Sequence, residues 1–210
     1  MTEKLKNVKL KYITGKGTLK GFISILTPSQ KYDNYQAHIL LSKEEGEALV
    51  KKMKDLQKQQ FELCGKKGKL ADLPCVPFTT QDENTGEEIP DSEGRYILKT
   101  SRKGHNSKGE TMPRPVVINA KKQLVTGRIN IGEGTTARLM VDLTGYKAPM
   151  GIGISAKLLG CQIINLVEYS SGGFSLDGFD EEDGFDGLGE EFKVEDSTAC
   201  VETEEEEEDF

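Results

Sequence analysis

Basic and aromatic side chains occur together at several places in the sequence, and their combined chemistry suits one kind of ligand. Lysine and arginine attract phosphate groups, and an aromatic face stacks on any nucleobase. The pattern therefore indicates a surface for single-stranded nucleic acid. A place in the hydrophobic core is the alternative for each ring, above all for Phe22 and Tyr96. The groups are Lys16, Lys20 and Phe22; Lys31, Tyr32 and Tyr35; Arg95, Tyr96 and Lys99; Arg102, Lys103, Lys108 and Arg114; and Tyr146 and Lys147.

Two of these groups are the strongest candidates for contact with a ligand. Tyr146 lies in the sequence Gly-Tyr-Lys-Ala-Pro, which we interpret as a turn where a buried ring would be hard to place, and Lys147 follows it directly. Residues 101–114 are basic and interrupted by glycines, which favours a loop that contacts phosphates. An ordinary solvated loop is the alternative for this segment.

Signatures of catalysis and metal binding are missing from the sequence. His38 and His105 are the two histidines, and neither has a spaced acidic partner typical of a general base. The glycines around Lys16 and Ile152 do not open a helix at the spacing of a nucleotide-binding loop. Cys64, Cys75, Cys161 and Cys200 form no C-x-x-C pair. We therefore expect no enzyme activity, no cofactor and no metal.

The charges divide the chain into two parts. Residues 170–210 hold 17 acidic residues and one basic residue, Lys193, which gives a net charge of -16. The remaining 169 residues hold 27 basic and 18 acidic residues, a net charge of +9. Such asymmetry favours polyanion binding by the basic part and an interaction or masking role for the acidic part. A merely solubilising tail is the alternative.

Alternating apolar and polar residues predict several strands. The pattern is clear in residues 7–13, where one face would be buried and the other basic, in 16–25, in 35–41 and in 95–100. It is clearest in 135–146 and 151–169. We expect a long loop at 81–94, and a hairpin that joins 95–100 to the apolar run 115–119 through a mobile basic tip.

One helix is predicted between the early strands. Ser42 and Glu45 have the spacing of a capping box, in which each side chain bonds the other residue's amide. Leu49, Met53 and Leu56 then recur at helical spacing up to a stop near Gly65. A mainly β fold follows: an OB-type β-barrel over residues 1–169 with one inserted amphipathic helix, and a disordered acidic C-terminal tail over 170–210. Periodicity alone leaves a β-sandwich open. Scattered cysteines and the lack of a long apolar stretch predict a soluble, cytoplasmic protein.

The chain resembles the tailed-phage single-stranded DNA-binding proteins, the OB-fold kind used in phage replication and recombination. The likeness is strongest from Gly132 to Gly173, where a Gly-x-Gly, the strand at 137–143, the Tyr146-Lys147 pair, the Gly-Ile-Ser-Ala-Lys-Leu strand and residues 164–168 follow in the family's order. A fainter likeness covers 21–28 and 35–60. The acidic end with a terminal aromatic, Glu204 to Phe210, also matches, although Ala148 and Pro149 stand where the family has a second aromatic.

The resemblance implies sequence-nonspecific binding of single-stranded DNA with Tyr146 holding a base. It also implies a tail that competes with DNA for the groove and docks the replicative DNA polymerase and the helicase/primase. The tail residues concerned are Glu204, Glu205, Glu206, Glu207, Glu208, Asp209 and Phe210. Dimerisation through the tails stays open. An interaction adaptor whose acidic tail mimics DNA toward a basic partner is the alternative function, and a nuclease is a third.

Overall fold

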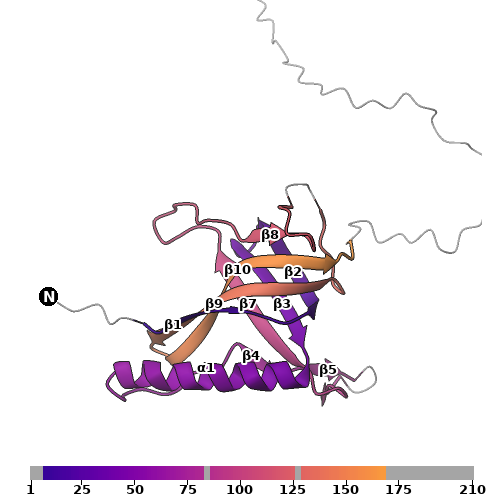
Figure 1. The fold of residues 1–210 in the computed structure, drawn as a ribbon. Helices are drawn as coiled ribbons and strands as arrows, with labels where there is room; N and C mark the ends of the chain where they lie inside the picture. The colour runs from indigo at the N-terminus through magenta and orange to yellow at the C-terminus, as the bar shows by residue number, and fades with distance from the viewer. Residues whose placement is uncertain (1–6, 83–85, 126–128, 169–210) are drawn as a thin grey trace, which may run out of the picture. The chain divides into compact units, whose positions relative to one another are not determined.

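The computed structural model describes residues 7–82, 86–125 and 129–168, which form a β-barrel with a helix across one end (Figure 1). The expected disorder of residues 170–210 lies outside the described residues. The helix α1 (Lys43–Leu63) follows the third strand. The strands are β1 (Lys9–Ile13), β2 (Gly17–Ser29), β3 (Asn34–Leu41), β4 (Cys75–Pro77), β5 (Thr79–Gln81), β6 (Glu88–Pro90), β7 (Tyr96–Lys103), β8 (Val116–Ile118), β9 (Thr136–Ala148) and β10 (Gly151–Asn165).

Five strands close into a ring in the order β2, β3, β7, β10, β9 and back to β2. The β7–β10 pair is parallel, and the other pairs of the ring are antiparallel. Each strand contributes fully buried apolar side chains to one core, among them Leu19, Ile39, Leu98, Leu139 and Leu158. A closed five-stranded ring with a helix inserted after its second strand confirms the OB-type barrel and excludes the sandwich.

The helix α1 begins and ends as its sequence predicts, with one difference. Ser42 Oγ accepts the Glu45 N–H at 3.3 Å, and bonds from Gly65 N to Glu62 O and from Lys66 N to Phe61 O close the C-terminus as a Schellman motif. The Glu45 carboxylate does not return to Ser42; it accepts the Gly15 N–H from the segment before β2. Only one of the two hydrogen bonds of the expected capping box is therefore formed, because the Glu45 carboxylate accepts a backbone N–H of the barrel instead of the Ser42 N–H.

Two buried glutamines attach α1 to the barrel. Gln60 Oε1 accepts the Val8 N–H at 2.9 Å, and Gln57 Nε2 donates to Ala71 O at 2.7 Å and to Ile152 O at 3.0 Å. A buried amide is tolerated only where its polar atoms find partners, and these amides find them in backbone groups. The apolar pattern of the helix contains no sign of these contacts.

Three expected elements differ in the structure. The segment 81–94 is not wholly a loop, because β6 lies within it and pairs with β5. The segments β7 and β8 do not form a hairpin; each pairs in parallel with β10. The strand β10 ends at Asn165, before Tyr169.

The buried face that alternation predicted for residues 7–13 is only partly formed at the edge strand β1. Val8 and Tyr12 are partly buried and pack against the core, and Lys52 of α1 lies over the Tyr12 ring, whereas Leu10 is exposed. No helix of the described residues is long and apolar enough to span a membrane.

Candidate nucleic-acid interface

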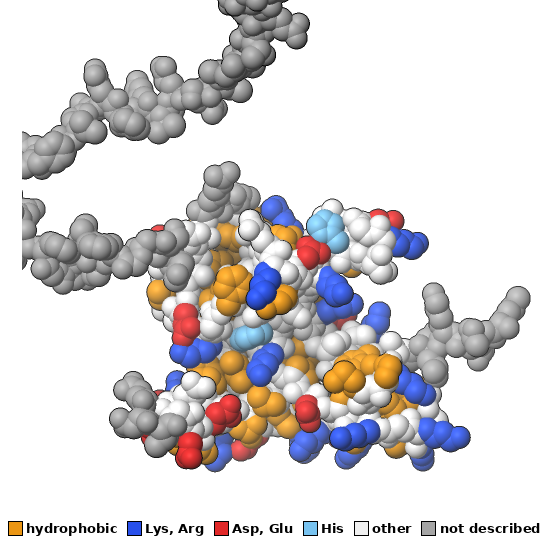
Figure 2. Space-filling model, turned by 180° about the vertical axis from the view of Figure 1, so that it is seen from behind, with side chains coloured by type: hydrophobic (Ala, Val, Ile, Leu, Met, Phe, Trp, Pro, Cys, Tyr) orange, Lys and Arg blue, Asp and Glu red, His pale blue; other side chains and the backbone are white. Residues whose placement is uncertain are grey.

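The outer face of the barrel carries a row of polar and basic side chains across four strands. Paired residues on neighbouring strands point to the same face of a sheet. His38 on β3 pairs with Lys20 on β2 and with Lys99 on β7. Ser101 on β7 pairs with Gln36 on β3 and with Lys157 on β10. Lys20, His38, Lys99 and Lys157 therefore share one surface, and the back view shows more Lys and Arg than Asp and Glu side chains on this side (Figure 2).

A groove of about 420 Å³ runs along this face between β7 and β10. Arg102 also reaches toward β10, where its Nη1 lies 3.5 Å from Leu158 O. The groove brings together four residues that the sequence predicted and one, Lys157, that it missed. Asp72 to Pro74 form one wall, and the basic and aromatic residues of the lining are Lys99, Arg102, Lys103, Tyr146 and Lys157.

Tyr146 lies within β9, not in the turn that its sequence suggested. The turn itself is formed by Pro149 and Met150, and Met150 is 88% exposed. Tyr146 pairs with Gly153 of β10, and its phenol end lies where a side chain at position 153 would begin. One side of the half-buried ring therefore covers Gly153, while the residue still lines the groove.

Two exposed aromatic side chains belong to β2 and to the turn that follows it. Phe22 and Tyr32 are 64% and 65% exposed, and Lys31 Nζ lies 5.1 Å from the centre of the Tyr32 ring. Tyr32 belongs to the β2–β3 turn, next to the pair formed by Asn34 and Lys103. An exposed ring, Tyr32, thus lies near the groove residue Lys103, and the half-buried ring of Tyr146 lines the groove itself.

Two of the predicted aromatic side chains pack inside the protein and do not present a ring to the solvent. Tyr35 is 7% exposed, since it shares the inward phase of Ala37 and Ile39 on β3. The ring of Tyr96 packs so closely on Gly46 of α1 that a side chain at position 46 would overlap it. We therefore leave Tyr35 and Tyr96 out of the interface.

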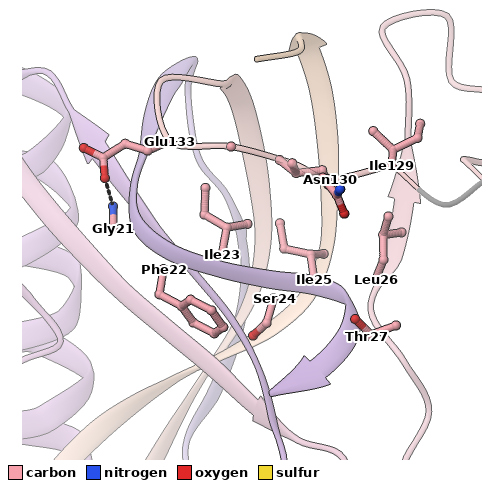
Figure 3. Close-up of a pocket in the computed structure, with 12 residues that line it drawn as sticks. Gly21, Phe22, Ile23, Ser24, Ile25, Leu26, Thr27, Ile129, Asn130 and Glu133 are labelled. Carbon is pink, nitrogen blue, oxygen red and sulfur yellow. Dashed lines mark hydrogen bonds between the residues drawn. The ribbon is translucent and has the colours of Figure 1, made fainter. Parts of the chain in front are cut away.

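The remaining predicted lysines and arginine differ in their surroundings. Lys20 forms an ion pair with Glu133, which also accepts the Gly21 N–H at 2.9 Å (Figure 3). That ion pair reduces the charge that Lys20 offers to a phosphate. Lys16, Lys108, Arg114 and Lys147 are exposed, and only Lys147 adjoins a residue of the groove.

A separate apolar pocket of about 510 Å³ lies between β2 and the segment 129–133. Ile23 and Ile25 point toward that segment, while Phe22 and Ser24 point to the opposite side of β2 (Figure 3). The pairing of β2 with β3 changes register between Lys20 and Ser24, so β2 is irregular next to this pocket. Its mostly apolar walls offer no row of cations for a nucleic-acid backbone.

His38 is neutral at physiological pH in the middle of the face. Burial is the main cause that lowers its pKa, and the neighbouring Lys99 lowers it further, against a hydrogen bond with the Ala37 backbone. His38 Nδ1 lies 3.3 Å from the Thr100 N–H, and a ring nitrogen can accept that bond only when it carries no proton. The charge of the face therefore comes from lysine and arginine.

Side chains that could bind a metal ion are not clustered in the described part of the chain. No three His, Cys, Asp or Glu side chains of residues 7–82, 86–125 and 129–168 lie close enough to hold a metal ion. Burial raises the pKa of Cys75 and of Cys161 to about 12, which keeps both thiols protonated.

The two histidines were expected to lack acidic partners, and for His105 this is wrong. His105 Nδ1 lies 2.9 Å from Asp33 Oδ1, a residue 72 positions away. The His105 N–H also donates to Asp33, so the pair fastens the β2–β3 turn to the turn after β7. Asn106 Oδ1 accepts two backbone N–H groups in the second turn, which makes its tip a hydrogen-bonded structure.

Comparison with known proteins gives a likeness in fold. No family model matches the sequence, and no curated protein matches it. The structure is similar to gp2.5, a single-stranded DNA-binding protein encoded by bacteriophage T7, with a TM-score of 0.61 and 16% identity over 85% of this chain and 98% of that one. It is also similar to a C-terminal truncation of the single-stranded DNA-binding protein from bacteriophage Enc34, with a TM-score of 0.50 and 15% identity over 80% of this chain and 98% of that one. The likeness confirms the expected resemblance at the level of the fold: the chain has the fold of phage single-stranded DNA-binding proteins.

Proposed function

We propose that this protein binds single-stranded DNA without sequence preference, through the groove between β7 and β10 and the adjoining outer face of β3. The observation that carries the proposal is the groove itself, which Lys99, Lys103 and Lys157 line together with the ring of Tyr146. OB-type barrels bind oligonucleotides on the face of their second and third strands, which are β3 and β7 here. The fold likeness to gp2.5 of bacteriophage T7 supports the same ligand.

The side chains of the groove suit a ligand of any sequence. Lysine ammonium groups contact phosphates, which are the same in every nucleotide, and an aromatic face stacks on every base. The proposed activity is binding alone, with no catalysis and no cofactor.

A titration of labelled oligonucleotides tests this proposal. The full-length protein should bind single strands of several sequences with similar affinity, should bind them more tightly as salt is lowered, and should prefer them to duplexes of equal length. Fluorescence anisotropy provides the measurement. Failure to bind any single strand at low salt would reject the function, and strong dependence on sequence would reject the nonspecific mode.

The acidic residues 170–210 compete, in our proposal, with DNA for the groove. A segment of net charge -16 tethered to a body of net charge +9 has a high effective concentration near it. A chain ending at residue 169 should therefore bind single strands more tightly than the full chain at low salt. The affinity of a full chain with Glu204 to Glu208 changed to Gln should lie between the affinities of these two chains. Equal or weaker binding by a truncated chain that keeps its circular dichroism spectrum would contradict the competition.

The end of the tail docks, in the same proposal, the replicative DNA polymerase and the helicase/primase during phage replication and recombination in the host cytoplasm. Acidic residues would steer it to a basic partner, and the Phe210 ring would enter an apolar pocket there. Deleting Phe210 alone removes no side-chain carboxylate. It should weaken binding to these partners in a surface-binding titration and leave the DNA affinity unchanged. Unchanged affinity for the partners would mean that the tail acts through its charge alone and that Phe210 is not an anchor.

The interaction adaptor remains the second candidate, because the acidic segment is the most strongly charged part of the sequence. In that case the barrel is a scaffold, and neither the full chain nor residues 1–169 would bind oligonucleotides.

A further inference from the structure

A second set of exposed lysines continues the basic groove beyond Tyr146. We propose that a DNA strand leaving the groove past Tyr146 runs across this set, which we call the exit surface. The inference rests on the proposed function and adds a second stretch of contact to it. The exit surface consists of Lys147 on β9, Lys66, Lys67 and Lys69 in the segment after α1, and Lys54 and Lys58 on α1; all six are exposed.

Main-chain hydrogen bonds place the first of these lysines beside the groove. The Ile152 N–H donates to Lys69 O at 2.8 Å, and the Ala71 N–H donates to Ile152 O at 2.9 Å. On its other side Ile152 pairs with Lys147. Lys69 and Lys147 therefore lie on either side of Ile152. The next residue, Gly153, is the one that the Tyr146 ring covers. The exit surface begins one residue from the proposed stacking position.

The backbone that carries Lys66, Lys67 and Lys69 is fixed at both ends. The Schellman motif of α1 fixes its start, and the Gln57 amide, bonded to Ala71 O and Ile152 O, fixes its end. Gly151 allows this close approach, because a side chain there would begin 2.6 Å from Lys69 O. A lysine on a fixed backbone loses less conformational freedom on binding than one on a free loop.

The row of positive charge continues along the helix. Lys54 precedes Gln57 by three positions and so lies beside it on the helix, and Lys58 lies one turn after Lys54. Asp55, Glu62 and Asp72 are the acidic residues nearby in the sequence. Across the ranges that the structure describes, none of the six lysines forms an ion pair with an acidic residue. Six uncompensated cations that continue a basic groove fit the phosphates of the same strand.

The exit surface predicts that affinity depends on oligonucleotide length in a particular way. A strand too short to pass Tyr146 fills the groove alone, whereas a longer strand adds phosphate contacts to the exit lysines. Each added contact releases counterions, so the salt dependence of binding should steepen with length.

The test compares full-length wild-type protein with K66E/K69E, using oligothymidylates from about 4 to about 16 nucleotides, the range of site sizes of OB folds. The variant should bind the shortest strands as wild type does. For the longest strands it should lose affinity, and its slope of log K against log salt should fall by about one for each lysine contact removed.

K121E/K122E is the matched control. It reverses two exposed lysines that lie next to β8, and each pair contains one lysine with a left-handed backbone, Lys66 with φ 56° and Lys122 with φ 61°. This control should show the wild-type length dependence. K54E/K58E, on the helix, gives a second variant of the exit surface in case K66E/K69E does not fold.

The outcomes separate the exit surface from the proposed function. If wild type binds no single strand, both fail. If wild type binds and both exit variants match it at every length, the exit surface is wrong. Equal losses of affinity at all lengths would also overturn it. Such losses would mean that these lysines act within the groove itself, or that they bind an acidic segment of the protein which in turn affects the groove. A loss confined to longer strands supports the inference.

Discussion

K99E/K157E should weaken binding of a single-stranded oligonucleotide by on the order of 10- to 100-fold at low salt. Lys99 and Lys157 are exposed and line the groove from its two strands, β7 and β10. The substitution replaces two attractive charges with two repulsive ones at the centre of the proposed path. The slope of log K against log salt should fall by about two, since two phosphate contacts are lost. Anisotropy titrations at several salt concentrations measure both quantities.

K121E/K122E again serves as the control, because it changes the net charge of the protein by the same amount away from the groove. If the two variants lose affinity equally, the effect comes from net charge and not from the groove. If K99E/K157E keeps the wild-type affinity and slope, the strand takes another path, and the exposed group at Lys31 and Tyr32 is the first place to look for it.

The strands of the barrel could be predicted because their alternation is strong, and the phase of that alternation also separates the site from the core. Tyr35 shares the phase of Ala37 and Ile39, and all three are buried. Lys157 lies between Ala156 and Leu158, two buried residues, and therefore points outward. Applying the phase to the candidates would have removed Tyr35 and added Lys157 from the sequence alone. It would also have removed Arg102, which shares the phase of Leu98 and Thr100 but still lines the groove near the end of β7.

Contacts between distant segments could not be predicted in the same way. The Glu45 carboxylate bonds the Gly15 amide, and the Gln57 amide bonds carbonyl groups of Ala71 and Ile152. In a helical pattern such polar residues are indistinguishable from solvated ones, because their partners are backbone groups set by tertiary packing. The parallel pairing of β7 with β10, which creates the groove, is likewise a property of barrel closure.

Tyr146→Ala should weaken single-strand binding by about 1–3 kcal/mol, the usual contribution of one base stacked on an aromatic ring. The salt dependence should stay as in wild type, because the substitution removes no charge. This combination distinguishes stacking from phosphate contact, for which affinity and slope fall together. The measurement is the same anisotropy titration, with thermal unfolding recorded beside it because the ring covers Gly153.

Tyr146→Phe is the control that keeps the ring and removes the hydroxyl group. Its affinity should match wild type if the aromatic face carries the contact, and should fall toward that of Tyr146→Ala if a hydrogen bond from the hydroxyl carries it instead. Replacing the ring also uncovers Gly153 on β10, next to Ile152 and the segment that Ile152 bonds. A flattened salt slope in Tyr146→Ala would therefore indicate that the neighbouring lysines have moved. The stacking contribution would then be measured with Tyr146→Leu, which fills part of the same space without an aromatic face.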